Sequence, residues 1–178
     1  MLKLKRCKWC TEDSEYIAYH DNEWGVETHG DNLLFEYLSL EGAQAGLSWL
    51  TVLKRRDGYR KSFCNFNVAS VAKLDSAEID EILQNGNVVR NKLKIKSVVR
   101  NAKSILEIQK EFGSFDQFIW SYSEKLAKLK GSEVAEMMSK DLKKRGFSFV
   151  GPTICYAFMQ AIGMVDDHEE GCFKFKET

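Results

Sequence analysis

Cysteine and histidine side chains near the two ends of the chain have the chemistry of a zinc site. Cys7 and His20 lie near the start, and His168 and Cys172 form an H-x3-C pattern near the end. On a helix, His168 and Cys172 would project from one face. The four side chains together could form a tetrahedral Cys2His2 site that joins the two ends of the chain. Their spacing is not that of a zinc finger, and Cys10 could compete with Cys7. Buried free thiols with a hydrogen-bonded core histidine are therefore the alternative.

A second candidate group is a lone acid in an apolar segment. In the segment LEGAQAGLSWL (40–50), Glu41 is the only carboxylate and Trp49 lies near its end. Two glycines would each cost roughly 1 kcal/mol in a helix interior, so we expect something to approach this backbone closely. If the segment is one helix, residues 41, 45 and 49 share a face that brings acid and indole together. The alternative is a solvated or capping Glu41 and a core Trp49.

Length and composition indicate an ordinary globular protein. The 178 residues suffice for one domain or two small lobes that share a core, and the chain is 44% apolar and 29% charged. One proline, Pro152, together with many Leu, Lys, Glu and Ala residues, favours an all-α fold. We expect no membrane segment, because no apolar run approaches about 20 residues. The start lacks a signal-peptide core and five cysteines suit a reducing compartment, so we expect a cytoplasmic location.

The charges cancel overall but are segregated along the chain. The net charge is zero, which argues against a simple nucleic-acid binder. Residues 12–36 carry acids without any Lys or Arg, whereas residues 90–103 and 140–145 are rich in bases. Such clusters can form a basic face on a neutral protein, and solvated helix faces are the alternative.

Apolar spacing and capping residues predict a series of helices. Asp31 could cap the first, and the pattern Asp75-x-x-Glu78 is a capping box. Ser114 with Gln117 could cap a helix that includes Tyr122. One helix is predicted to begin after Asp31. Further helices are predicted over residues 75–85, 91–111, 114–122, 132–145 and 152–162. The best short alternating run, FSFV at 147–150, lies between two of them.

The junction RGFSFVGPT (145–153) predicts a tight hairpin between two helices. Pro152 would lie in the first turn of the second helix, and Gly163 would follow its last turn, as helix ends prefer. Free N–H groups and the positive dipole end at this helix start suit a phosphate. A plain packing corner is the alternative.

Three long segments resemble a known enzyme family. The runs YIAYHDNEWGV (16–26), LEGAQAGLSWLTVLKRR (40–56) and GFSFVGPTICYAFMQAIG (146–163), the last followed by Asp167 and His168, are closely similar to 3-methyladenine DNA glycosylase I, the constitutive bacterial type. The resemblance extends from about Cys7 to Cys172. It implies an all-α helix-hairpin-helix glycosylase fold with a structural zinc site that joins the N- and C-terminal segments. It also implies one glycosylase domain over residues 1–178, or two helical lobes with the base pocket between them, and a hairpin over about 132–163.

The resemblance also implies roles for individual residues. The zinc ligands would be Cys7, His20, His168 and Cys172. Glu41 and Tyr19 would be catalytic. The base would be bound by Trp49, with Trp9 and Trp24 nearby. The DNA backbone would be held by Gly146, Gly151, Thr153 and Lys144.

The chemistry of these residues agrees with that family. A base inside a duplex must be flipped out before an enzyme can reach it, and stacking on Trp49 would contribute roughly 1–3 kcal/mol. An ionised Glu41 would accept a hydrogen bond from adenine's amine and would prefer the positively charged alkylated ring. We expect the glycines and alanines around Glu41 to let the flat base lie against the backbone.

The expected function is hydrolytic excision of 3-methyladenine from alkylated double-stranded DNA, with the free base and an abasic site as products. We expect a monomer. We expect no lyase activity, because the hairpin position that carries a lysine in lyases is Thr153 here. The wider superfamily has a catalytic aspartate near the position of Asp166. We expect Asp166 to be dispensable and to face solvent or the zinc region.

Two other functions remain open at this stage. One is a catalytically silent protein that binds alkylated bases. The other is a hydrolase or deaminase with a catalytic zinc ion. Four protein ligands would leave that zinc no open position, and the zinc deaminase signature is absent.

Overall fold

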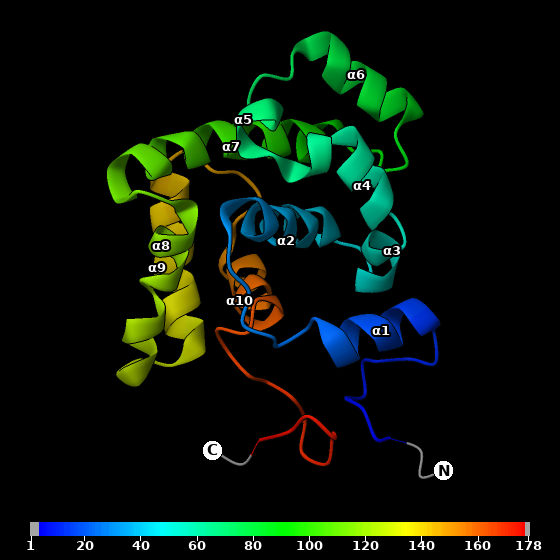
Figure 1. The fold of residues 1–178 in the computed structure, drawn as a ribbon, viewed down its shortest axis with the longest axis vertical. Helices are drawn as coiled ribbons and strands as arrows, with labels where there is room; N and C mark the ends of the chain where they lie inside the picture. Colours follow the sequence, from blue (N-terminus) through cyan, green and yellow to red (C-terminus); the bar gives the residue numbers. More distant parts are fainter. Residues whose placement is uncertain (1–3, 177–178) are drawn as a thin grey trace.

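The computed structural model describes residues 4–176, and over this range the chain is helical with no β-strand, as the sequence predicts. None of these helices is both long and apolar enough to cross a membrane. The elements, labelled in Figure 1, are α1 (Ser14–Asn22), α2 (Asp31–Gln44), α3 (Trp49–Leu53), α4 (Arg56–Ser62), η1 (Cys64–Phe66), α5 (Val68–Val71), α6 (Ser76–Asn85), α7 (Lys92–Phe112), α8 (Phe115–Trp120), η2 (Ser123–Ala127), α9 (Gly131–Lys144) and α10 (Pro152–Ala161).

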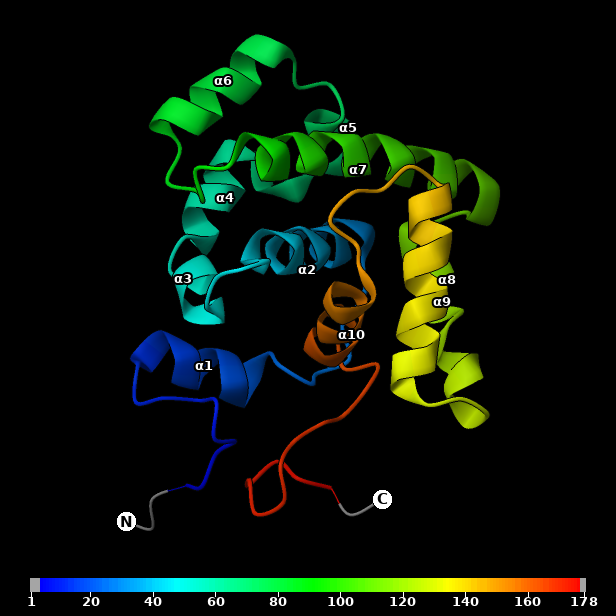
Figure 2. The same cartoon turned by 180° about the vertical axis from the view of Figure 1, so that it is seen from behind.

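Helix α2 lies at the centre of the fold. It packs against α7 on one side and α10 on the other, while α1 and the first and last described residues lie at the end of the molecule opposite α6 (Figures 1 and 2). Every residue of α2 from Leu34 to Ala43 is buried. A helix that is buried all round belongs to the core, so the two acids within this stretch are enclosed by protein.

One of these acids, Glu36, belongs to a buried ion-pair network. The Arg56 guanidinium on α4 donates to Glu36 and also to Glu23, which follows α1. The Tyr37 hydroxyl donates to Glu23 as well, at 3.0 Å. Part of the acidic segment 12–36 is therefore bound internally, and the network fastens α1, α2 and α4 together.

Most predicted helix ends agree with the structure. Asp75 and Glu78 form the capping box, and Gly113 ends α7 in the left-handed region at φ +88°. The Ser114 side chain accepts from the Gln117 N–H, as predicted. Helix α8, however, ends at Trp120 and does not include Tyr122. The reason is local, because the hydroxyls of serines 121 and 123 bond the carbonyls of residues 118 and 120, which favours a turn.

The prediction that Asp31 caps its own helix was wrong. Gly30 is the N-cap of α2, and Asp31 is its first residue. The Asp31 carboxylate instead accepts the N–H groups of Phe115 at 3.0 Å and Asp116 at 2.9 Å, at the start of α8. It also accepts the Gln109 amide at 2.6 Å. Because the first N–H groups of a helix have no partner within it, this carboxylate fastens α8 to the central helix.

Several cations of the basic segment 90–103 have partners elsewhere in the chain, and one of them is buried. Lys94 is only 7% exposed, and its ammonium donates to the carbonyls of Ala43 and Ala45. Arg100 donates to the Gly146 carbonyl at 2.6 Å, and Lys92 pairs with Asp80 at 2.7 Å. This part of α7 therefore matches neither alternative from the sequence, since some of its cations are neither free to form a basic face nor simply solvated.

Helices α9 and α10 pack against each other and are joined by the predicted hairpin loop (Figure 2). Gly146 follows α9 at φ +91°, which suits glycine. The FSFV run forms turns rather than a strand, with Phe149 at φ +56°. The Asn101 side chain on α7 bonds the backbone N–H and carbonyl of Ser148. The loop conformation therefore depends on a contact from outside the hairpin.

Replacement of Asp31 by Ala should lower the free energy of unfolding by about 1–2 kcal/mol, because the N–H groups at the start of α8 lose their acceptor. Urea denaturation monitored by circular dichroism measures this. Asp57→Ala is the matched control, since the Asp57 side chain is 85% exposed. Equal stability of the two variants would contradict the capping role of Asp31.

Candidate active site and metal-binding group

A cavity of about 390 Å³ opens between α1, α2, the start of α3 and α10. This volume is in the range of small-molecule pockets. The five residues predicted for the base pocket all line it, namely Trp9, Tyr19, Trp24, Glu41 and Trp49. Residues from positions 9–49 and from positions 157–169 therefore meet at one cavity.

Glu41 is buried in the wall of this cavity without a charged partner. It is 3% exposed, and within the described residues its Oε2 atom has no hydrogen-bond partner. Burial alone raises the pKa of this carboxyl to about 8. In the free protein at neutral pH the group is therefore mostly protonated, whereas the hydrogen bond expected from the sequence needs its ionised form. A positive charge in the cavity would favour ionisation.

Aromatic rings form most of the remaining wall. The ring centroids of Tyr19 and Trp49 are 5.2 Å apart, and those of Trp9 and Trp24 are 5.0 Å apart. The buried Trp49 Nε1 atom has no acceptor among the residues that the structure describes. Burial, and next the neighbouring Glu41 charge, raise the pKa of Tyr19 well above its usual value. Tyr19 therefore remains a neutral phenol.

The acid and the indole do not share one helix face, contrary to the prediction from residues 41, 45 and 49. Helix α2 ends at Gln44, and Gly46 turns the chain at φ +77°. The Ser48 side chain then accepts the Thr51 N–H and caps α3, which begins at Trp49. A turn between two helices, rather than helical spacing, brings Glu41 and Trp49 to the cavity.

The glycine beside the acid accommodates the hairpin loop and not a base. A Cβ atom on Gly42 would lie 3.2 Å from the Phe149 carbonyl oxygen and 3.3 Å from its Cβ. Gly42 is also not among the residues that line the cavity. The expectation that this glycine supports a flat base was wrong, because the loop between α9 and α10 approaches there.

Several cavity residues were not predicted. They are Tyr16, Gln44, Ala157, Gln160, Asp167 and Glu169. Tyr16 lies one helical turn before Tyr19, and Gln44 lies one turn after Glu41, so helical periodicity could have identified both. Asp167 could not have been chosen over Asp166 from the sequence. Asp167 accepts from the Tyr156 hydroxyl at 2.6 Å and the Gln160 amide at 2.7 Å.

The charge of the cavity has one sign. Glu41, Asp167 and Glu169 contribute carboxyl groups, and none of the described lining residues is a lysine or an arginine. Carboxylates near a low-dielectric wall attract positive charge. The cavity therefore suits a flat cation better than a neutral or anionic ring.

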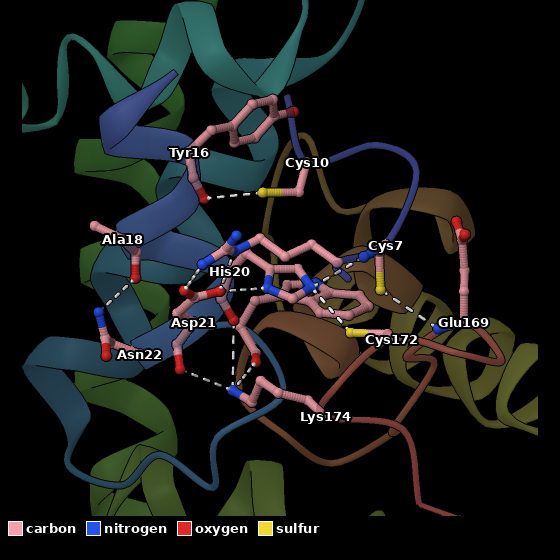
Figure 3. A network of polar contacts seen from close by, with 12 residues as sticks. Cys7, Cys10, Tyr16, Ala18, His20, Asp21, Asn22, Glu169, Cys172 and Lys174 are labelled. Atoms are coloured by element: carbon pink, nitrogen blue, oxygen red, sulfur yellow. Dashed lines mark hydrogen bonds and ion pairs between the residues drawn. The ribbon is translucent and has the colours of Figure 1, made fainter. Parts of the chain in front are cut away.

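Behind this cavity lies a group of side chains that could hold a metal ion. The donor atoms of Cys7, His20 and Cys172 lie within 4.8 Å of one another, and all three residues are buried. The sulfurs of Cys7 and Cys172 lie around the His20 imidazole (Figure 3). The Cys10 sulfur is instead 3.7 Å from the carbonyls of Thr11 and Tyr16. Cys10 therefore does not belong to this group.

His168, the fourth predicted ligand, lies beside the group. Its ring centroid is 5.4 Å from that of His20 and 4.6 Å from that of Trp24. A Cβ atom on Gly25 would approach the ring to 2.6 Å, so glycine makes room for it. The buried Nε2 atom has no partner in residues 4–176. This orphaned nitrogen is what a metal ligand would present.

Carboxylates orient both imidazoles. His20 Nδ1 lies 2.9 Å from Asp21, and His168 Nδ1 lies 2.6 Å from Asp166. Carboxylates bonded to Nδ1 leave Nε2 as the ligand atom, which is the usual arrangement of metal-binding histidines. Asp166 thus faces the histidine of the candidate metal site, which is one of the two orientations expected for it.

The C-terminal segment holds the two ends of the chain together. The Phe173 N–H donates to the Lys5 carbonyl at 2.8 Å. The Lys174 ammonium lies 3.3–3.4 Å from the carbonyls of His20, Asp21 and Trp24, at the end of α1 (Figure 3). A cation suits this negative end of a helix. The tail therefore stabilises the helix that carries Tyr19 and His20.

The residues predicted to bind the DNA backbone lie away from the cavity lining. Lys144 is exposed at the end of α9, and Thr153 is exposed in the first turn of α10. Gly151 is the N-cap of α10, and a Cβ atom there would meet nothing within 4 Å. The neighbouring Arg145 is bound by Glu111 at 2.6 Å. Lys144 is therefore a freer cation of the hairpin than Arg145.

Comparison with known proteins agrees with this geometry. The family model described as methyladenine glycosylase matches residues 9–175. The chain belongs to this family. It is 43% identical to DNA-3-methyladenine glycosylase 1 of Escherichia coli K12, covering 95% of this chain and 96% of that protein. It is 45% identical to DNA-3-methyladenine glycosylase of Haemophilus influenzae Rd, covering 94% and 96%.

Solved structures of the methyladenine glycosylase family have the same fold. A crystal structure of 3-methyladenine DNA glycosylase I matches with a TM-score of 0.90 at 43% identity, covering 97% of this chain and all of that one. The Staphylococcus aureus enzyme, whose structure concerns 3-methyladenine recognition, matches with a TM-score of 0.90 at 34% identity, covering 98% and 99%. The family resemblance read from the sequence is therefore confirmed.

The raised pKa of Glu41 predicts a pH-dependent stability. The folded-state pKa is about 8 and the ordinary value is 4.5, so the folded protein binds a proton that the unfolded chain releases between these pH values. Stability from this group should therefore fall as pH rises from 4.5 to 8, by on the order of 3 kcal/mol. Urea denaturation at pH 5 and pH 8 measures it. Glu41→Gln should lack this component, and an unchanged pH dependence in that variant would contradict the assignment.

Proposed function

We propose that this chain hydrolyses the N-glycosidic bond of 3-methyladenine in alkylated double-stranded DNA, releasing the free base and leaving an abasic site. The observation that carries this proposal is the buried Glu41 carboxyl, which has no charged partner in the described residues. It lies in an aromatic cavity whose described lining contains further acidic residues and no lysine or arginine. The named activity of the relatives supports it, and one related structure contains 3-methyladenine. The proposed protein is a cytoplasmic monomer, since its substrate would be chromosomal DNA.

The cavity geometry fits an extruded base. A base must leave the duplex stack to enter such a pocket, at a cost of a few kcal/mol. Stacking against the rings of Trp49 and Tyr19 would offset roughly 1–3 kcal/mol of that cost. The carboxyl of Glu41 would then meet the exocyclic amine, and the unpaired Trp49 Nε1 would donate to a ring nitrogen. These two groups define the orientation of the base.

Selectivity for damage follows from the charge of the lesion. A normal adenine is neutral and offers no charge to offset the cost of ionising the buried Glu41 carboxyl. Methylation at N3 makes the base positive, which favours the ionised carboxylate and a charge-assisted hydrogen bond. The same acid is therefore a poor partner for normal bases and a good one for the alkylated base.

The chemical step needs little more than placement. An N3-methylated adenine is already a good leaving group, so the protein must hold it extruded and stabilise positive charge that develops on the sugar. Asp167 is the acid of the cavity wall that two side-chain donors orient, which makes it the candidate for that stabilisation. Tyr19 would position the base as a neutral phenol.

The hairpin would hold the DNA backbone near the cavity. The N-terminal end of α10, with Gly151 as N-cap and Thr153 in its first turn, offers backbone N–H groups to a phosphate. Gly146 lets the loop turn tightly after α9, and Lys144 adds positive charge. Binding to undamaged DNA would depend on such phosphate contacts, so it should weaken as the salt concentration rises.

The metal group would have a structural role. Cys7, His20, His168 and Cys172 would be the zinc ligands, and the unpartnered Nε2 of His168 supports its inclusion. Bound zinc would cross-link the two ends of the chain. Trp9 and Trp24 pack on these histidines and also line the cavity, so the ligands lie behind the pocket wall. This arrangement does not favour zinc-activated water as the nucleophile.

Release of free base tests the proposal directly. Duplex DNA treated to carry N-methylpurines is incubated with wild type and Glu41→Gln, and released bases are separated by chromatography. Wild type should release 3-methyladenine, and the variant should be slower by about 10²-fold, since it removes charge stabilisation in a dry site. Glu107→Gln, on an exposed residue, is the control. Binding without base release would identify a silent lesion binder, and a borohydride-trapped adduct would contradict monofunctional hydrolysis.

Metal content tests the zinc proposal. Wild type should contain about one zinc ion per chain, and Cys7→Ser should lose it, because a tetrahedral site needs all four ligands. Cys10→Ser should retain the metal, since the Cys10 sulfur faces backbone carbonyls instead. Elemental analysis of the purified proteins measures both. Loss of zinc from the Cys10 variant alone would overturn the assignment.

A further inference from the structure

We propose that α7 sets the spacing between the base pocket and the hairpin, with Lys94 and Asn101 as positioning residues. The inference rests on the proposed function, because it concerns two sites that must engage one DNA molecule together. Lys94 and Asn101 do not line the cavity. Their influence would therefore be exerted through the backbone segments that they hold.

Lys94 holds the end of the helix that carries the acid. Its ammonium donates to the Ala43 carbonyl at 2.8 Å and to the Ala45 carbonyl at 2.6 Å. These carbonyls flank Gln44, which lines the cavity one turn after Glu41. The last carbonyls of a helix have no partner within it and attract cations. Lys94 therefore fixes the point at which α2 stops and the turn toward Trp49 begins.

Asn101 holds the hairpin loop from the same helix. Its Oδ1 atom accepts the Ser148 N–H at 2.8 Å, and its Nδ2 atom donates to the Ser148 carbonyl at 3.0 Å. The side chain is 3% exposed, so both groups would be costly to leave unpaired. Arg100 adds a bond to the Gly146 carbonyl at 2.6 Å. Two adjacent residues of α7 thus hold the loop on either side of Phe147.

The spacing between these contacts is set by helix geometry. Lys94 and Asn101 are seven positions apart on α7, which corresponds to about 10 Å along the axis. The held segments also touch each other directly, because Gly42 on α2 meets the Phe149 backbone. The central helix, the loop and α7 therefore each contact the other two.

Such an arrangement matters for a base-flipping enzyme. The phosphate held at the hairpin and the base held in the cavity belong to one strand, so their separation is imposed by the DNA. A misplacement of about 1 Å at a reacting centre can cost about 10²-fold in rate. A buried lysine and a buried amide on one rigid helix would keep this separation constant.

The test separates binding of the base from processing of duplex DNA. Lys94→Met removes the ammonium and keeps the aliphatic stem, and Asn101→Ala removes both loop contacts. Lys110→Met is the control, because Lys110 is an exposed residue at the far end of the same helix. Each protein is assayed for affinity toward free 3-methyladenine by titration, and for kcat and KM on N-methylpurine duplex DNA.

The two variants should fail differently. Asn101→Ala should bind free 3-methyladenine as wild type does and lose about ten-fold or more in kcat/KM on the duplex, because only the relation of hairpin to pocket changes. Lys94→Met should bind the free base about ten-fold more weakly and lower kcat, with little change in KM for the duplex. A purely structural role would lower the melting temperature without this split.

Several results would overturn the inference. Duplex kinetics of Asn101→Ala equal to those of Lys110→Met would do so, and so would equal losses of free-base and duplex affinity in that variant. If Lys94→Met does not unfold cooperatively, the Asn101 variant decides the question alone. Failure of the proposed function is distinguishable, because wild type itself would then release no 3-methyladenine.

Discussion

The rest of the structure is organised around a carboxyl group that is buried without a compensating charge. Removal of a carboxylate from water is costly, and a protein normally avoids the cost by pairing the group or leaving it protonated. Glu36, five residues earlier on the same helix, is paired with Arg56, whereas Glu41 has no such partner in the described residues and its pKa is raised to about 8. The protein therefore holds a site whose preferred state depends on the charge of what enters it. Enclosure of α2 on all sides is the structural requirement for this property.

The cavity around this group is built by parts of the chain that are far apart in sequence. Trp9 and Trp24 come from the N-terminal region, and Asp167 and Glu169 come from the segment after α10. Both regions contain candidate metal ligands and are further joined by the backbone contact of Phe173 and the ammonium contacts of Lys174. A metal that joins the ends of the chain would thus stabilise a wall of the pocket as well as the fold.

Much of this could be predicted from the sequence, for identifiable reasons. Capping patterns at Asp75 and Ser114 are local, and they were correct because nothing distant competes with them. The five residues expected at the base pocket do line one cavity, while their roles stay predictions. What could not be predicted depended on distant partners. Asp31 caps a helix more than 80 positions away, and Gly42 faces a loop more than 100 positions away. Lys94 was expected to belong to a basic surface cluster. It is instead held by backbone carbonyls, and no sequence pattern identifies such acceptors.

The indoles of Trp9 and Trp24 belong to two environments at once. Each ring lines the cavity and also packs against the His20 imidazole of the metal group. Thermodynamic linkage requires that any free energy transferred through these rings be reciprocal. If a metal were bound at this group and an incoming base tightened the packing of the indoles, the base would strengthen the hold on the metal by the same amount as the metal strengthens the hold on the base. A structural metal there would therefore act as an allosteric effector of lesion affinity without taking part in bond cleavage.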